Sequence, residues 1–113
     1  MTGPGGAAQD LARRVADVVA AIPPGRVLSY KDVAELAECR SPRRVGTLMA
    51  RNPTGAELPW WRVVTVQGTL AGPLQAEARE RYRAEGTPLR EDGRPPLRVD
   101  MARALWTPGP PGP

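Results

Sequence analysis

GRVLSYKDVAELAECRSPRRVGTLMARNP, residues 25–53, contains two short helix patterns separated by a turn. Ser29 is typical of an N-cap, with Asp32 three residues later as the second member of a capping box. Leu28, just before the cap, can pack on Val33 as a hydrophobic staple. The apolar residues that this first helix is expected to bury are Val33, Leu36 and Ala37.

The second helix pattern begins at Ser41-Pro42, a capping serine with proline at the first helical position. Its buried face is expected to carry Val45, Leu48 and Met49, three and four residues apart. Its opposite face presents Arg43, Arg44, Thr47 and Arg51. Two short helices joined by a tight turn, the second with a basic outer face, predict a helix-turn-helix.

The flanking sequence adds a helix upstream and a hairpin downstream. Residues 10–22 have apolar side chains at helical spacing, and this pattern ends at the breaker Pro23-Pro24-Gly25. Residues 62–66 (RVVTV) have the β-branched pattern of a strand, Gln67-Gly68 that of a turn, and residues 69–71 that of a short return strand. These three segments together predict a small β-hairpin.

The last part of the chain is expected to cover this core. Residues 74–86 predict a charged helix that ends at Gly86. Residues 94–106 predict a short extended piece, with Trp106 packing back on the body. The expected fold is therefore mostly α-helical with a small β-hairpin, a winged-helix-like domain built around the helix-turn-helix.

The length of 113 residues is enough for one small domain. We expect a flexible leader over residues 1–9, a single domain over 10–106, and a disordered Pro/Gly tail over 107–113. The sequence has no export signal and no apolar run near the roughly 20 residues of a membrane span. With Cys39 as its single cysteine, we expect a cytoplasmic protein without an internal disulfide, and a monomer.

The basic charge is concentrated in one part of the sequence. Formal net charge is +4, and between Cys39 and Thr65 five arginines stand against one acidic residue, Glu57. The rest of the chain holds eleven basic and eleven acidic residues. A local excess of this kind favours a polyanionic partner, and the alternative is a solvated arginine-rich face.

The composition excludes several kinds of catalytic site. The chain has no histidine and one cysteine, so neither a Ser-His-Asp nor a Cys-His arrangement can form. A zinc site built on imidazole or paired thiolates is excluded for the same reason. We expect no metal and no cofactor.

Residues 58–64, LPWWRVV, place two tryptophans between a proline and an arginine. They follow IPPGRVLSYKDVAELA (22–37) and RRVGTLMARNP (43–53). In this order and at these spacings, the three blocks resemble the DNA-binding domain of the O6-alkylguanine-DNA alkyltransferases. The resemblance covers residues 11–86 and implies the helix-turn-helix fold of the alkyltransferase C-terminal domain.

The resemblance also implies that transfer chemistry is absent. The alkyltransferase motif is Pro-Cys-His-Arg-Val, in which the cysteine takes the alkyl group and the histidine helps make it a thiolate. Trp60 and Trp61 occupy these two positions, and neither can act as nucleophile or base. A sister group, the alkyltransferase-like proteins, has Pro-Trp-His-Arg-Val and binds alkylated guanine without repairing it. This chain resembles that group and is therefore expected not to be an enzyme.

Further roles follow from the same resemblance. Arg43 matches the arginine that fills the space left by an extruded base, and Tyr30 the tyrosine that rotates the 3′ phosphate of the target. Asn52 matches the hinge between the two motifs. Glu85 matches the glutamate that supports the catalytic histidine. With Trp61 in the histidine position, we expect Glu85 to have lost that partner and to be an ordinary helix-end carboxylate.

Two sets of site residues are thus implied. The DNA-binding residues are Tyr30, Arg43, Arg44, Thr47 and Arg51, and the lesion-pocket residues are Tyr30, Met49, Trp60, Trp61 and Val63. Trp60 is expected to line a base-binding pocket, whereas Trp61 either packs beneath that pocket or contacts DNA. Arg62 is expected to tie the strand to a neighbouring carbonyl. The segment GTLAGP (68–73) lacks the basic residue with which many alkyltransferase-like proteins touch the modified guanine.

Three functions are compatible with these features. The first is a non-catalytic sensor that flips O6-alkylguanine out of duplex DNA and flags it for nucleotide excision repair, associated with the nucleoid when bound. The second is a helix-turn-helix DNA-binding module without lesion specificity. The third is an enzyme in which Cys39 accepts alkyl groups, although the order of the motifs places Cys39 far from the pocket. The expected partners of the first are duplex DNA containing alkylated guanine and nucleotide-excision-repair proteins, with no membrane.

Overall fold

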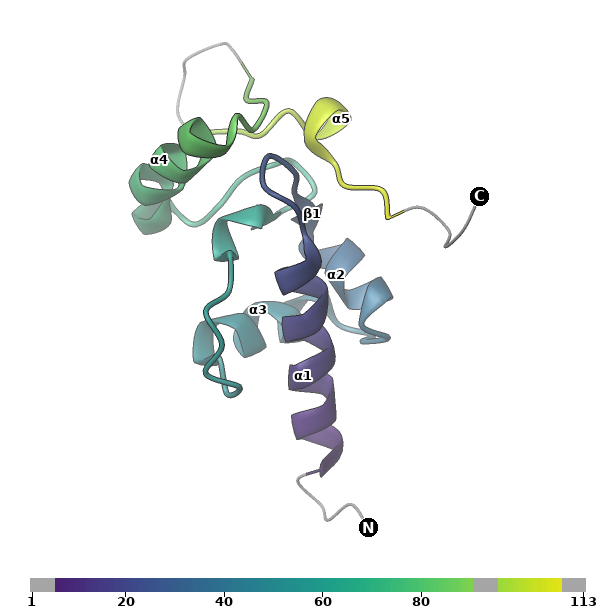
Figure 1. Ribbon diagram of the computed structural model, residues 1–113. Coiled ribbons are helices and arrows are strands. Elements are labelled where there is room, and N and C mark those ends of the chain that lie inside the picture. Colours follow the sequence, from purple (N-terminus) through teal and green to yellow (C-terminus); the bar gives the residue numbers. More distant parts are fainter. Residues whose placement is uncertain (1–5, 91–95, 109–113) are drawn as a thin grey trace.

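Three helices from the first half of the chain pack around one core (Figure 1). They are α1 (Gly6–Ala21), α2 (Tyr30–Leu36) and α3 (Pro42–Arg51). The structure, a computed structural model, describes residues 6–90 and 96–108. The buried side chains of this first core include Val15, Val19, Ile22, Val33, Ala34 and Val45. The three expected helices are therefore present, and their apolar faces meet.

Both helices of the predicted helix-turn-helix begin at the expected caps. The Ser29 hydroxyl accepts the Asp32 amide at 3.0 Å, while the Asp32 carboxylate accepts the Ser29 amide at 3.1 Å. The Ser41 hydroxyl accepts the amide of Arg44 at 3.2 Å, with Pro42 at the first helical position. These capping bonds satisfy amides that have no partner within the helix, which fixes where each helix begins. The α2–turn–α3 unit is thus confirmed.

The sheet is two-stranded, as expected, but its strands are parallel. Strand β1 (Leu28–Ser29) pairs with β2 (Val63–Val64), so the expected hairpin over residues 62–71 is wrong. After β2 the Thr65 amide donates to the Thr69 carbonyl at 3.0 Å, and the two threonine hydroxyls lie 2.6 Å apart. These bonds close a tight loop, and so no return strand pairs with β2.

The second half of the chain builds a second core against β2. It contains α4 (Gln75–Glu85) and α5 (Met101–Ala104), and its buried side chains include Val27, Val64, Ala78, Tyr82 and Val99. Helix α4 ends at Gly86, whose φ of 71° is the left-handed conformation expected of a C-terminal glycine. The Trp106 amide donates to the Val27 carbonyl at 2.9 Å, which confirms that the C-terminal segment packs back on the body. Helix α5 was not expected, because four residues are too few for a periodic pattern.

The ends of the chain differ in part from expectation. Residues 6–9, expected in the leader, already belong to α1, since no helix breaker separates them from Asp10. Residues 1–5 of the expected leader and 109–113 of the expected tail lie outside the described residues. Among the helices of residues 6–90 and 96–108, none is long and apolar enough to cross a membrane.

Candidate functional site

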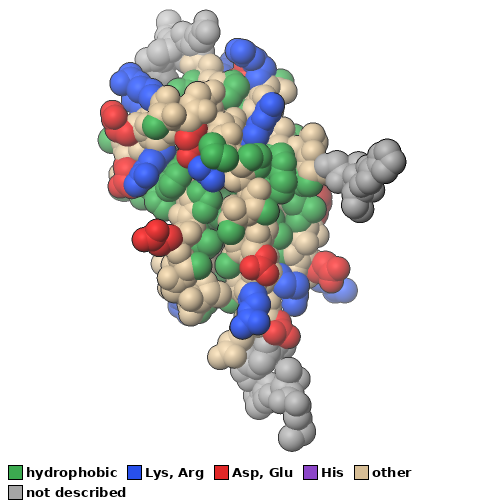
Figure 2. All heavy atoms as spheres, viewed as in Figure 1, with side chains coloured by type: hydrophobic (Ala, Val, Ile, Leu, Met, Phe, Trp, Pro, Cys, Tyr) green, Lys and Arg blue, Asp and Glu red, His purple; other side chains and the backbone are tan. Residues whose placement is uncertain are grey.

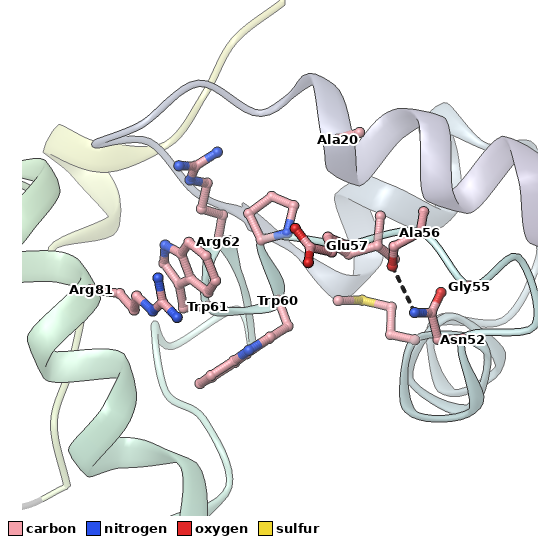
Figure 3. A pocket seen from close by; sticks show the side chains of 12 residues that line it. Ala20, Asn52, Gly55, Ala56, Glu57, Trp60, Trp61, Arg62 and Arg81 are labelled. Carbon is pink, nitrogen blue, oxygen red and sulfur yellow. Dashed lines mark hydrogen bonds between the residues drawn. The ribbon is translucent and has the colours of Figure 1, made fainter.

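A cavity of about 640 Å³ opens beside the tryptophan pair (Figure 3). It lies where the end of α3 and the following loop meet a 3-10 turn, η1 (Trp60–Arg62), and helix α4. Its lining includes Met49, Asn52, Glu57, Trp60, Trp61 and Arg81. This volume falls within the roughly 300–1,000 Å³ of pockets that hold small molecules or single bases. The cavity is therefore open in spite of the second tryptophan.

Trp60 is half-buried at this cavity and packs partly against the second core. Its ring meets that of Trp61 edge to face, with centroids 5.6 Å apart and planes at 88°. This geometry is a favoured one for aromatic pairs, so each indole fixes the orientation of the other. Trp60 is thus a large aromatic surface held in one orientation at the cavity.

Trp61 lines the same cavity but is also tied to α4. Its indole Nε1–H donates to Glu85 Oε2 at 2.9 Å, and its carbonyl accepts the Tyr82 hydroxyl at 2.6 Å. The guanidinium of Arg81 lies 4.6 Å from the centroid of the Trp61 ring and that of Arg62 lies 5.4 Å from it. Cations at such distances are attracted to the indole face. Trp61 is therefore a packed and hydrogen-bonded anchor as well as a lining residue.

Glu85 is the centre of this network, and the expectation that it has lost its partner is wrong. Its carboxylate accepts hydrogen bonds from Trp61, from Arg62 at 2.5 and 3.0 Å, and from the Gly25 amide at 3.2 Å. An indole N–H is a donor, so Trp61 can meet an acceptor much as an imidazole N–H would. Burial alone would raise the pKa of Glu85, but hydrogen bonds from Arg62, Gly25 and Trp61 outweigh it and lower the pKa below its usual value.

Arg62 ties three segments together. Besides its ion pair with Glu85, its Nη1 donates to the Ile22 carbonyl at 2.9 Å. The expectation of a structural arginine bound to a neighbouring carbonyl is therefore confirmed. Because Ile22 directly follows α1 and Glu85 is the last residue of α4, this one side chain fixes both helix ends against the turn that presents Trp60.

The basic face of the helix-turn-helix is exposed. Arg43, Arg44, Thr47 and Arg51 all point to solvent from α3, and the Thr47 hydroxyl donates to the Arg43 carbonyl at 3.2 Å. Tyr30 is half-buried at the start of α2, and burial raises its pKa. With Arg43, Gly46 and Thr47 it borders a separate hollow of about 520 Å³. The five expected DNA-binding residues thus lie on one α2–α3 surface.

The expected lesion pocket is only partly brought together. Met49, Trp60 and Trp61 line the cavity, whereas Tyr30 borders the separate hollow on α3 and Val63 is fully buried. Val63 cannot line the cavity because it pairs with Leu28 in the sheet and its side chain belongs to the first core.

Arg81 lines the cavity but was not predicted as a site residue from the sequence. A signal was available, since Arg81 and Glu85 are four residues apart and lie on one face of the predicted helix. Any partner of Glu85 at residue 61 therefore lies close to Arg81 as well. The segment 68–73, where a basic residue is missing, contributes no residue to the cavity lining in the described part of the chain.

Two other singled-out residues have structural surroundings. Asn52 ends α3 in the left-handed conformation, with φ 45°, and its side-chain amide donates to the Ala56 carbonyl at 2.7 Å, which shapes the loop toward the tryptophans. Cys39 is half-buried between α2 and α3, and its thiol donates to the Ser41 carbonyl at 3.4 Å. Cys39 does not belong to the cavity lining.

Comparison with known proteins adds to this geometry. Residues 10–87 match the sequence family described as "6-O-methylguanine DNA methyltransferase, DNA binding domain". A DNA base-flipping protein of Escherichia coli is 42% identical over 97 residues, which are 83% of this chain and 72% of that protein. Alkyltransferase-like protein 1 of Schizosaccharomyces pombe is 25% identical over 100 residues, 84% of this chain and 93% of that protein.

The fold is also similar to a solved one. The crystal structure of S. pombe Atl1 in complex with damaged DNA containing O6-carboxymethylguanine superposes with a TM-score of 0.76. The match covers 88% of this chain and 97% of that one, at 23% sequence identity. The mostly helical fold of the alkyltransferase-like type is thereby confirmed.

Proposed function

The chain belongs to the family of the 6-O-methylguanine DNA methyltransferase DNA-binding domain, and from this membership we propose that it is a non-catalytic sensor of O6-alkylguanine in duplex DNA. It binds the duplex through α3, turns the damaged nucleotide out of the helix and holds the base in the cavity beside Trp60. The observation that carries the proposal is Trp60 itself, a fixed aromatic surface at an open cavity next to a basic helix-turn-helix.

Stacking on Trp60 supplies the affinity for an extruded base. A base inside a duplex is out of reach of any pocket, and flipping it out costs a few kcal/mol. Stacking of one base on an aromatic side chain returns roughly 1–3 kcal/mol and tolerates varied substituents. An alkylated guanine pairs less well than guanine and therefore costs less to extrude. The combination favours the damaged base over its normal counterpart.

The α2–α3 surface provides the remaining steps. We assign to Arg43, exposed in the first turn of α3, the role of stacking in the gap that the flipped nucleotide leaves. Tyr30, beside it in the same hollow, turns the neighbouring phosphate. Arg44, Thr47 and Arg51 contact the DNA backbone and carry no sequence information. The name DNA base-flipping protein of the E. coli relative supports the base-flipping step.

No alkyl transfer accompanies binding. Indole is neither a nucleophile nor a base at neutral pH, so neither tryptophan of the motif can accept an alkyl group. The thiol of Cys39 lies outside the cavity lining and bonds to the Ser41 carbonyl. The bound lesion is therefore left intact, and the complex marks it for a nucleotide-excision-repair complex.

The proposal is tested by equilibrium binding to two duplexes that differ in one O6-methylguanine, at one stated salt concentration. Wild type is expected to bind the lesion duplex more tightly. Trp60→Ala is expected to remove most of this preference, about 1–3 kcal/mol, and to leave binding of the unmodified duplex nearly unchanged. Arg43→Ala is expected to weaken lesion binding more than unmodified binding.

Arg13→Ala is the control, because Arg13 is an exposed arginine of α1 that lines neither the cavity nor the α2–α3 hollow. It should behave as wild type on both duplexes. Equal affinity of the wild type for the two duplexes would instead leave a general DNA-binding module. A gain in protein mass of one methyl group after incubation would show that Cys39 or another group accepts the alkyl.

A further inference from the structure

Two guanidinium groups line the cavity, and they differ in how they are bound. Arg62 is largely buried, and its donors go to Glu85 and to the Ile22 carbonyl. Arg81 is half-exposed, and its ion pair with Glu77 is long, at 3.9 Å, between two exposed side chains. Within residues 6–90 and 96–108, no protein acceptor lies within hydrogen-bond distance of the Arg81 guanidinium. Its donors therefore remain available to a ligand.

The ring of Trp61 nevertheless orients Arg81. Its guanidinium lies 4.6 Å from the centroid of the Trp61 ring, and the Trp61 indole is itself bonded to Glu85, one helical turn further along α4. Figure 3 shows Arg81 reaching from α4 toward Trp61, with Trp60 on the same side of the cavity. A planar cation above an aromatic ring loses little freedom on binding a further partner. The cavity thus presents an aromatic surface and an oriented set of N–H donors together.

We propose that Arg81 reads the extruded base, by donating hydrogen bonds to the acceptor edge of an O6-alkylguanine stacked on Trp60. The proposal rests on the proposed function and names the group in the cavity that recognises guanine. The edge of guanine that carries O6 and N7 offers acceptors only, and it pairs with arginine more often than with any other side chain. Alkylation at O6 leaves the N7 acceptor in place. Guanidinium has donors only, so the two edges are complementary.

The segment 68–73 offers no charged group for this contact. It contains no charged residue, and in the described structure none of its side chains lines the cavity. Arg62 is committed to Glu85, so Arg81 is the cavity cation left to meet a base.

The test uses three duplexes that differ at one position: O6-methylguanine, guanine, and an abasic site that keeps the phosphates but has no base. Binding of wild type, Arg81→Gln and Arg81→Lys is measured at several salt concentrations. Arg79→Gln is the matched control, because Arg79 is an exposed arginine of the same helix outside the cavity lining. Thermal unfolding of each variant confirms that it is folded.

Arg81→Gln is expected to lower the preference for O6-methylguanine over guanine by about tenfold, the effect of losing one good base contact. Its affinity for the abasic duplex is expected to stay at the wild-type value. Arg81→Lys keeps a cation above Trp61 but lacks the planar fork, so it too is expected to lose most of the preference. Arg79→Gln is expected to keep it.

Two results would overturn the assignment while leaving the proposed function intact. One is a wild-type preference that survives in Arg81→Gln. The other is an equal loss on all three duplexes, with the salt slope reduced by about 0.9, which identifies a phosphate contact. A wild type that does not distinguish the lesion duplex from the guanine duplex would overturn the proposed function and this assignment together.

Discussion

Trp61 gives the Glu85 carboxylate a hydrogen-bond donor that acts neither as an acid nor as a base. Its indole N–H reaches the Glu85 carboxylate at 2.9 Å, so the helix-end carboxylate keeps a partner from the motif. Indole has no second nitrogen and does not titrate near neutral pH, so this partner transfers no proton. The Trp61–Glu85 contact is thus a fixed hydrogen bond without acid–base chemistry. From the sequence alone we expected Glu85 to have lost its partner, because a sequence shows residue types and not the reach of a donor.

The Glu85→Gln variant is expected to have a lower unfolding free energy than wild type, and this free energy is expected to depend less on pH in acid. Because the folded-state pKa of Glu85 is lowered, its ionised form stabilises the fold above the unfolded-state pKa of about 4.3. This contribution is lost as pH falls through the lower, folded-state pKa. At pH 7 we expect the variant to lose about 1–3 kcal/mol of unfolding free energy.

Denaturant unfolding of both proteins between pH 7 and pH 3 checks this prediction. The difference between wild type and Glu85→Gln should shrink steadily below about pH 4.3. Glu80→Gln, an exposed acid on the same helix, is the control and should change stability by no more than about 0.5 kcal/mol. A difference that stays constant across this range would mean that the ionised carboxylate does not hold the network.

Among the elements, the loop after β2 holds the C-terminal segment against the second core. Gly68 has φ +86°, and its carbonyl accepts the Val99 amide at 2.9 Å. A Cβ added at Gly68 would stand 2.4 Å from the Val99 carbonyl oxygen. This close approach allows the C-terminal segment to lie against the loop, and only glycine permits it.

Gly68→Ala is therefore expected to lower the unfolding free energy by about 2 kcal/mol or more, from backbone strain and from displacement of the Val99 segment. Two controls separate these causes. Gly55→Ala has a similar φ of +71° with open space around it, and Gly72→Ala has open space without a positive φ. Thermal unfolding should rank Gly68→Ala lowest, Gly55→Ala next and Gly72→Ala near wild type. A Gly68→Ala variant as stable as Gly55→Ala would contradict the close approach.

The helical elements could be predicted because their signals are local. Ser29, Ser41 and Gly86 mark helix ends by hydrogen bonds and backbone conformations that involve only near neighbours. The pairing of Val63–Val64 with Leu28–Ser29 joins segments more than thirty residues apart. A β-branched run indicates a strand but not its partner. The predicted hairpin therefore paired this strand with the wrong segment.

In the whole molecule, the five arginines of the basic window have two different environments. Arg40, Arg43, Arg44 and Arg51 of the basic window are exposed, whereas Arg62 is withdrawn into its pair with Glu85. Figure 2 shows one face, on which apolar side chains gather in the middle, with charged side chains around and among them. The basic excess was predictable from the sequence. The structural role of Arg62, one of these five arginines, was expected from its place in the motif.

Cavity residues could be predicted where a sequence motif contains them. They could not be predicted where folding brings in a residue from a distant segment. Met49 and Trp60 were found from adjacent blocks of sequence, and both line the cavity. Arg81 comes from a helix some twenty residues later and enters the cavity only because α4 is bonded to Trp61 through Glu85. Val63 was wrongly placed in the pocket, since the sequence does not show which face of a two-residue strand is buried.

In the proposed function, a damaged base leaves the duplex and lies in the cavity beside Trp60. The most direct measurement is the structure of the complex with a duplex that contains one O6-methylguanine. We predict the methylated base outside the duplex, stacked on Trp60 between Met49 and Arg81, with Arg43 in the space it has left and its methyl group still attached. An O6-methylguanine that remains stacked and paired in the duplex, with the cavity free of any base, would contradict the account.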